Sequence, residues 1–109
     1  MARLIQNCQM RVIIGKGGMG GATQTACVQF GCVYFQVVGG AASVLAQKVE
    51  RVGSVHFLRE FGTAEAMWEL FVREMEAVVT MDSRGHSLHR RVKNASAREL
   101  NAVLAAGWA

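Results

Sequence analysis

A glycine-rich segment with one lysine is the part of this sequence best suited to hold a ligand. It spans residues 15–20 (GKGGMG) and follows the largely β-branched run of residues 10–14 (MRVII). Glycines let a backbone approach a ligand closely, and the start of a following helix presents unpaired N–H groups. A lysine adds a mobile point charge that suits a carboxylate or phosphate oxygen. The pattern indicates an anion site, and its alternative is a tight turn with an exposed lysine.

The same segment matches the G-x-G-x-x-G dinucleotide fingerprint letter for letter. That fingerprint needs an acidic residue about twenty positions further on to bind a ribose hydroxyl. Here Gly39 and Gly40 occupy that region, and the first acidic residue of the chain is Glu50. A phosphate P-loop is also disfavoured, because Lys16 stands second in the segment instead of after its last glycine. Nucleotide binding therefore stays a minor alternative.

The segments around the loop alternate between strand and helix patterns. Gly31 and the Gly39–Gly40 pair punctuate the first half, which predicts parallel strands joined by right-handed helical crossovers. Residues 82–85 have the composition of a hairpin turn, which predicts a returning strand over 87–92. Ser96 and Glu99 form a capping-box pattern at the start of a last helix. The predicted strands are 10–14, 32–38, 52–58, 68–72 and 77–81, and the predicted helical segments are 22–30, 41–49, 64–66 and 96–104.

Length and composition predict one α/β domain over residues 1–109. Apolar residues make up 51% and charged residues 18% of the chain, which supplies a core and excludes disorder as the main state. Polar residues interrupt every apolar run before the length of a membrane-spanning helix or a secretory signal. The three cysteines form no C-x-x-C pair, which disfavours a zinc knuckle or a disulfide framework. We expect a cytoplasmic protein with buried, reduced thiols.

Five of the twelve basic residues fall late in the chain, next to two histidines. A solvated surface is the expected role of this cluster, because no aromatic residue interleaves to stack bases. Contact with phosphate or an acidic partner is the alternative. His86 and His89 are expected to be exposed polar residues, with a metal pair or a general base as the alternative. The basic residues are Arg84, Arg90, Arg91, Lys93 and Arg98.

Four separated blocks, taken in order, carry a family resemblance. They are residues 13–20 (IIGKGGMG), 37–46 (VVGGAASVLA), 64–70 (AEAMWEL) and 79–85 (VTMDSRG). Together they resemble the C-terminal, or beta-subunit, domain of class I fumarate hydratases and L(+)-tartrate dehydratases. The resemblance implies a swivelling β/β/α domain that closes over an iron-sulfur hydro-lyase site. In this family a 4Fe-4S cluster is held by cysteines of the alpha subunit or N-terminal domain and acts as a Lewis acid.

The resemblance also implies roles for particular residues and partners. Lys16 matches the family lysine that binds a substrate carboxylate, and none of the present residues is expected to be catalytic or to bind metal. The expected partners are the cluster-bearing alpha chain and a C4 dicarboxylate, with no nucleic acid and no membrane. The predicted substrate-binding residues are Lys16, Gly15, Gly17 and Gly18, with Gly39 and Gly40 as weaker candidates.

The chain departs from the family pattern in two places. The family's Arg-Asp and Gly-Pro-Thr-Thr segments precede the lysine loop and have no counterpart here, so we expect a domain that is incomplete at its N-terminus. Residues 62–65 (GTAE) replace the usual Gly-Met-Pro-Glu. The expected function is part of a hydro-lyase that hydrates fumarate to (S)-malate and is inactive without the remaining parts. The alternatives are a tartrate dehydratase beta subunit and a non-catalytic assembly module, and an exposed sheet edge would favour a homo- or hetero-oligomer.

Overall fold

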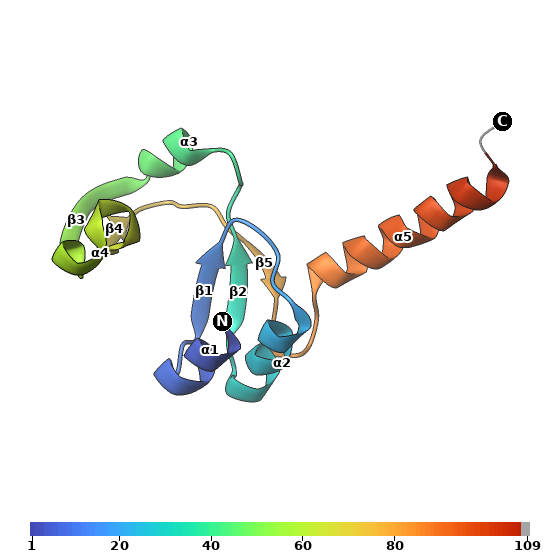
Figure 1. The fold of residues 1–109 in the computed structure, drawn as a ribbon, viewed down its shortest axis with the longest axis horizontal. Helices are drawn as coiled ribbons and strands as arrows, with labels where there is room; N and C mark the ends of the chain where they lie inside the picture. Colours follow the sequence, from blue (N-terminus) through green and yellow to red (C-terminus); the bar gives the residue numbers. More distant parts are fainter. Residues whose placement is uncertain (108–109) are drawn as a thin grey trace. The chain divides into compact units, whose positions relative to one another are not determined.

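The computed structural model describes residues 1–107, and the chain divides into two compact units (Figure 1). The first unit contains Met1–Val37 together with the chain from Ala77 onward. The second unit is the intervening segment, Val38–Glu76. The glycine loop belongs to the first unit.

A three-stranded sheet forms the centre of the first unit, in the order β1-β2-β5 (Figure 1). Strands β1 (Val12–Gly15) and β2 (Val33–Gln36) are parallel, and helix α2 (Gly21–Phe30) connects them. This confirms the predicted strand-loop-helix-strand order and the parallel pairing. Strand β5 (Val78–Met81) pairs antiparallel with β2, so the sheet is mixed. The protein is therefore an α/β structure with small sheets.

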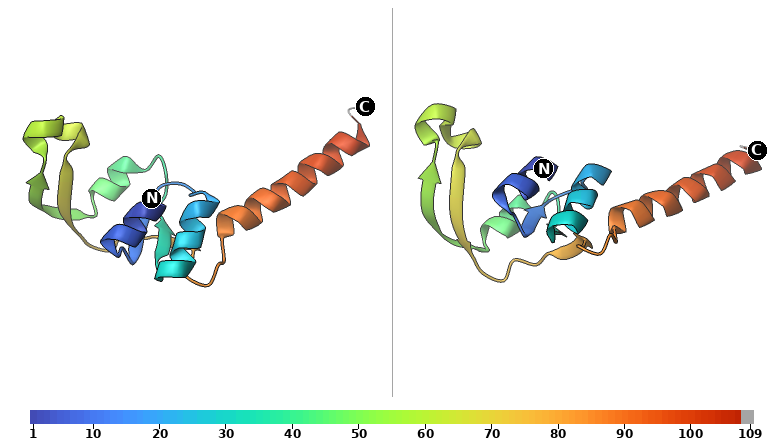
Figure 2. Two further views of the ribbon diagram at one scale, coloured as in Figure 1. Left: turned by 60° about the horizontal axis from the view of Figure 1, so that its bottom comes forward. Right: turned by 90° about the horizontal axis from the view of Figure 1, so that it is seen from below.

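Helices α1 (Ala2–Cys8) and α2 pack side by side on one face of this sheet (Figure 2). Side chains from both helices and all three strands meet there, and burying each large one stabilises the fold by about 1.5–3 kcal/mol. Because strand side chains alternate between faces, the neighbours of Ile13 point the other way. Val12 and Ile14 are more than half exposed. The core residues are Ile5, Ile13, Ala26, Cys27, Cys32, Tyr34 and Met81.

Helix α5 (Leu88–Ala106) corrects the prediction for the end of the chain. The predicted strand over 87–92 is wrong, since only Ser87 pairs with Met81, in an isolated bridge. Ser87 is the N-cap instead, and its hydroxyl accepts a hydrogen bond from the Arg90 N–H at 3.2 Å. The predicted start at Ser96 therefore lies inside the helix. In the described part of the chain, no helix is both long and apolar enough to cross a bilayer.

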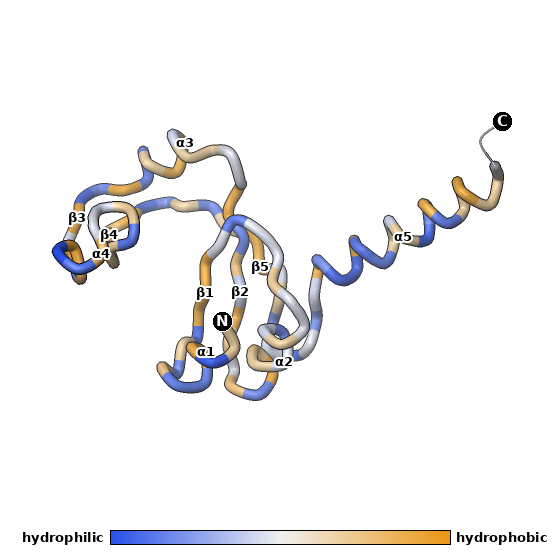
Figure 3. Tube along the Cα trace, in the orientation of Figure 1, coloured by the Kyte–Doolittle hydropathy of each residue, from blue (hydrophilic) through white to orange (hydrophobic). Residues whose placement is uncertain are grey.

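Polar and apolar residues alternate along α5 (Figure 3). None of the residues in this helix is buried. Its basic residues lie mostly in the first half, and its larger apolar residues, such as Leu100 and Leu104, lie in the second. All five residues of the late basic cluster are exposed, and whether they contact only solvent or also an anion stays a prediction.

The second unit consists of two strands and two short helices. Strands β3 (Val49–His56) and β4 (Met67–Val72) form an antiparallel pair. Helix α3 (Ala42–Ala46) precedes this pair and ends three residues earlier than predicted. Helix α4 (Leu58–Glu65) joins the strands and is longer than the predicted turn at 64–66.

Strands β3 and β4 contact each other through side chains that remain exposed or half-buried. The Arg51 guanidinium lies 3.4 Å from the centroid of the Phe71 ring. Gly53 lies against the same ring, where a Cβ would come within 2.8 Å of it. Residues 38–76 are all described, and none of them is fully buried.

The three cysteines differ in exposure, and this difference should be measurable. Cys27 and Cys32 are fully buried, and burial together with the neighbouring Cys32 raises the pKa of the Cys27 thiol to about 11. Cys8 is exposed. Because the thiolate is the reactive form, we expect iodoacetamide to label one thiol of the folded chain, at Cys8, and all three after unfolding. Peptide mass spectrometry reads the sites, with Cys8→Ser as the control, and rapid labelling of Cys27 in the folded protein would contradict the packing.

Candidate functional site

The glycine loop connects the carboxyl end of β1 to the start of α2. Gly15 is the last residue of β1, and Gly20 is the N-cap of α2. The Gly20 carbonyl accepts hydrogen bonds from the N–H groups of Thr23 and Gln24 at 3.1 and 3.2 Å. No side chain caps this helix end, and its first turn contains no acidic residue. The positive end of α2 therefore faces the loop without a neutralising side chain.

Tyr34 fixes the glycine loop through contacts with Gly15 and Gly17. This residue lies on β2, is 1% exposed, and its hydroxyl donates a hydrogen bond to the Gly17 carbonyl at 2.5 Å. Its ring occupies the space beside Gly15, where a Cβ would come within 2.2 Å of the Tyr34 oxygen. The Val37 N–H donates to the Gly15 carbonyl at 2.8 Å. Two carbonyls of the loop are thus fixed, one by Tyr34 of β2 and one by Val37 directly after β2, and Gly15 must lack a side chain.

His89 on α5 covers the loop at a second point. A Cβ at Gly18 would come within 3.1 Å of the His89 ring. The same ring stands edge-on to Tyr34, with the ring centroids 6.3 Å apart. His89 is half-buried, and its Nε2 atom is buried without a hydrogen-bond partner among the described residues. The prediction that His89 is an exposed polar residue is therefore wrong, whereas His86 is exposed as predicted.

Lys16 is exposed at the tip of this fixed loop. Its ammonium group makes no ion pair or side-chain hydrogen bond with any residue in the range 1–107. It is therefore not turned inward to a structural partner. The structure brings Lys16 together with Gly15, Gly17 and Gly18 by chain continuity and by the Tyr34 contacts. Binding of a substrate by these residues stays a prediction.

The other two predicted binding residues, Gly39 and Gly40, lie in the second unit. They form the turn between β2 and α3, and Gly40 has a φ of 77°, a left-handed value that favours glycine. The turn geometry alone therefore accounts for glycine at Gly40. Their part in ligand binding also stays a prediction.

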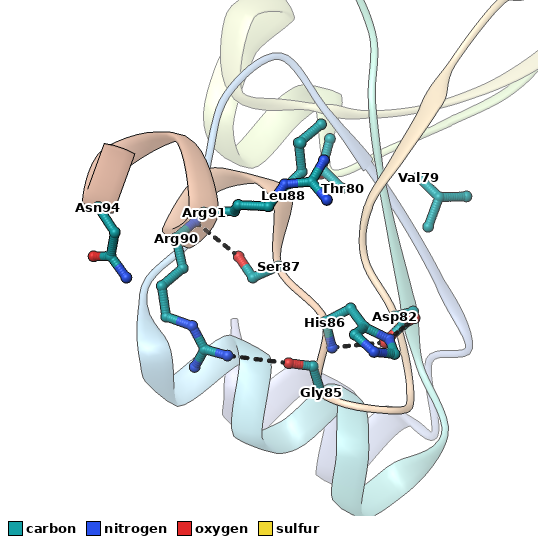
Figure 4. A pocket seen from close by; sticks show the side chains of 10 residues that line it. All are labelled: Val79, Thr80, Asp82, Gly85, His86, Ser87, Leu88, Arg90, Arg91 and Asn94. Carbon is teal, nitrogen blue, oxygen red and sulfur yellow. Dashed lines mark hydrogen bonds and ion pairs between the residues drawn. The ribbon is translucent and has the colours of Figure 1, made fainter. Parts of the chain in front are cut away.

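A second group of polar residues lies where β5 meets α5, and the part of it that sequence reasoning missed is the Asp82 carboxylate (Figure 4). Asp82 Oδ1 accepts the N–H groups of Arg84 and His86, both at 2.9 Å. Its Oδ2 lies 2.8 Å from the His86 ring nitrogen Nδ1. The turn itself is predicted from the composition of residues 82–85, and the aspartate at the start of Asp-Ser-Arg-Gly-His is the signal for these bonds, because aspartate readily bonds backbone N–H groups just ahead of it.

The side chains that usually bind metals do not converge in the described part of the chain. No group of three or more His, Cys, Asp or Glu residues within 1–107 could hold a metal ion. Cys27 and Cys32 are adjacent in the core, whereas Cys8 is exposed on α1. These residues do not fit the cysteine set of an iron-sulfur cluster.

Sequence comparison assigns most of the chain, including the glycine loop, to a known family. A sequence profile described as the fumarase C-terminus matches residues 1–92. The chain belongs to this family. Only the first residues of α5 fall within the matched region of this fumarase C-terminal chain.

Individual relatives agree with the family match. A Geobacillus stearothermophilus protein that carries the name fumarate hydratase class I is 47% identical over 92 residues, which are 84% of this chain and 18% of that protein. An Escherichia coli K12 L(+)-tartrate dehydratase subunit beta is 32% identical over 85 residues, 77% of this chain and 42% of the relative. A Methanocaldococcus jannaschii protein that carries the same subunit name is 38% identical over 92% of this chain and 52% of its own length. The fumarase C-terminal chain thus spans about half the length of these relatives, or less.

Replacing Gly15 should test how tightly Tyr34 fixes the loop. Gly15→Ala would push the buried Tyr34 ring and break its bond to Gly17, so we expect a loss of about 1–3 kcal/mol in the free energy of unfolding. Gly17→Ala is the matched control, because a Cβ there meets nothing within 4 Å. Urea denaturation measures both variants. Equal stability of the two would contradict the contact.

The Asp82 turn should respond to acid. Its hydrogen bonds, the His86 ring first, lower the pKa of Asp82 below the ordinary aspartate value. Because the folded pKa is the lower one, the stabilisation is complete above the ordinary value and is lost as pH falls through the lowered pKa. We expect the amide resonances of Arg84 and His86 to shift together below about pH 4. Asp82→Asn should abolish this titration, and a midpoint at or above the ordinary value would contradict it.

Proposed function

We propose that this chain is part of a hydro-lyase in which Lys16 binds a carboxylate of a C4 dicarboxylate substrate. The observation that carries the proposal is an exposed, unpaired lysine on a loop whose backbone is fixed by Tyr34. Its family relatives carry the names fumarate hydratase and tartrate dehydratase, both enzymes that act on such acids. Fumarate is the substrate we favour, because the G. stearothermophilus relative is the most similar of the three described.

The physical argument rests on the charges around the loop. An ammonium group attracts a carboxylate most strongly where no carboxylate of the protein already neutralises it. Lys16 has no such partner among the described residues, and the uncapped start of α2 adds partial positive charge nearby. The glycines beside Lys16 let a substrate approach the loop backbone. Lys16 therefore binds and orients the substrate, and proton transfer belongs to other groups.

The remaining parts of such an enzyme would come from outside this chain. The E. coli relative is named as a subunit beta, which supports a second, alpha-type subunit as partner. We assign the 4Fe-4S cluster to that partner, since the described residues of this chain offer no suitable set of ligands. In this proposal the chain acts in the cytoplasm as a swivelling β/β/α domain. Its closure would bring Lys16 to a substrate held by the partner.

A non-catalytic assembly module is the second candidate function. Exposed apolar side chains on the sheet face opposite the helices favour it, because Val12, Ile14 and Val79 are each 47–55% exposed. Such a face marks a surface that another protein element can cover. This candidate needs no ligand at Lys16, and binding of a dicarboxylate at the loop would separate the two.

Removing the Lys16 charge should weaken dicarboxylate binding. We expect Lys16→Met to reduce kcat/KM about 10- to 100-fold when the chain is assembled with its cluster-bearing partner, because a charge-assisted hydrogen bond contributes about 1.5–3 kcal/mol. Lys93→Met is the matched control. It removes the same charge from an exposed position on α5 and should change kcat/KM less than about twofold.

A binding measurement on the isolated chain complements the kinetic one. Titration with succinate, an unreactive C4 dicarboxylate, should shift the amide resonances of residues 16–18 in the wild type and the Lys93 variant, and not in the Lys16 variant. If Lys16→Met left both the loop shifts and kcat/KM unchanged, the proposed role of this lysine would be refuted and the assembly module would be favoured.

A further inference from the structure

A hollow of about 520 Å³ lies in the first unit, between β5, the turn that follows it and the first two turns of α5 (Figure 4). Its walls include Thr80 from β5, His86 from the turn, and Arg90 and Arg91 from α5. No residue of the glycine loop lines this hollow. It is therefore a separate place from the loop that carries Lys16.

Neither arginine of the hollow forms an ion pair with a carboxylate in the described part of the chain. Arg91 makes no ion pair or side-chain hydrogen bond with the described residues. The Arg90 guanidinium contacts two neutral acceptors, the Gly85 carbonyl at 3.3 Å and Gln24 Oε1 at 3.4 Å. Neither contact removes its charge. The first turn of α5 contains no acidic residue, so the positive end of this 19-residue helix adds to both arginines.

Asp82 is the acidic residue that lines the hollow, and its carboxylate is already occupied. One oxygen accepts two backbone N–H groups, and the other meets the His86 ring. These bonds lower the pKa of Asp82 and hold its charge within the turn. Asp82 therefore closes the turn instead of pairing with either arginine, which leaves the arginines available to a ligand.

Thr80 supplies an independent sign of a missing ligand. Its side chain lines the hollow and is 4% exposed, yet its hydroxyl has no hydrogen-bond partner among residues 1–107. Buried hydroxyl groups are nearly always bonded, and an unbonded one costs free energy. A ligand that offers oxygen acceptors next to Arg91 could satisfy both the arginine and this hydroxyl.

We propose that this hollow binds a small oxyanion, a phosphate or a carboxylate group, held by Arg91 and Arg90 at the start of α5. Arginine presents several N–H donors in a plane and pairs with both kinds of group. The helix end contributes its partial charge, and the unpartnered Thr80 hydroxyl is a further donor. This site is independent of the proposed role of Lys16, so either can fail without the other.

The test compares two arginines of the same helix in the full chain. Inorganic phosphate and succinate are titrated separately, at constant ionic strength, while amide resonances of residues 86–91 are followed by NMR. We expect saturable shifts in the millimolar range with one or both anions. Arg91→Gln should weaken this binding at least about tenfold. Arg98→Gln removes the same charge two turns further along α5, outside the hollow, and should weaken it less than about twofold.

The choice of anion and two further variants complete the test. Saturation by phosphate alone assigns a phosphate group, and saturation by succinate alone assigns a carboxylate group, with either supporting the site. Thr80→Val, which keeps the shape of the side chain, should weaken binding without loss of helix signal by circular dichroism, and Lys16→Met should leave it unchanged. Equal weakening by Arg91→Gln and Arg98→Gln, or the lack of saturation with both anions, would overturn it.

Discussion

The packing of one buried tyrosine against a residue without a side chain is the constraint on which the loop depends. The Tyr34 ring fills the position that any Cβ at Gly15 would occupy, and its hydroxyl holds the Gly17 carbonyl. A lysine between these two glycines is then carried by a rigid backbone although its own side chain is free. Because the loop backbone is already fixed while the Lys16 side chain is exposed, the ammonium group can contact a ligand without the cost of ordering the chain.

Much of the first unit could be predicted from sequence, because its signals are local. The β-branched run at 10–14, the glycine loop and the Gly31 helix end each specify an element by themselves, and the structure has β1, α2 and β2 in that order. Strand β5 was also placed correctly along the chain. Its antiparallel direction was not predicted, because the direction depends on the path of the intervening second unit.

The contacts that shape the candidate site were beyond such reasoning. Tyr34 meets Gly17 across 17 positions, and His89 meets Gly18 across the whole second unit, so no spacing rule reveals either pair. The misread start of α5 has a local cause. Residues 87–92 (SLHRRV) can continue a hairpin, and in the structure the Ser87 hydroxyl accepts the Arg90 N–H and the Ser87 carbonyl accepts the Arg91 N–H, so a helix begins there. The Ser-x-x-Glu capping box at Ser96 is a more specific sequence signal for a helix start than the lone Ser87.

The second unit leaves the sheet and returns to it between two neighbouring strands. Gln36 at the end of β2 lies opposite Val78 at the start of β5, one strand spacing away, about 4.8 Å. The whole excursion of residues 38–76 is thus, for the sheet, a long connection between adjacent antiparallel strands. A short reverse turn would bridge the same gap. Natural or designed variants could therefore exchange, shorten or replace this excursion while the three strands keep their pairing.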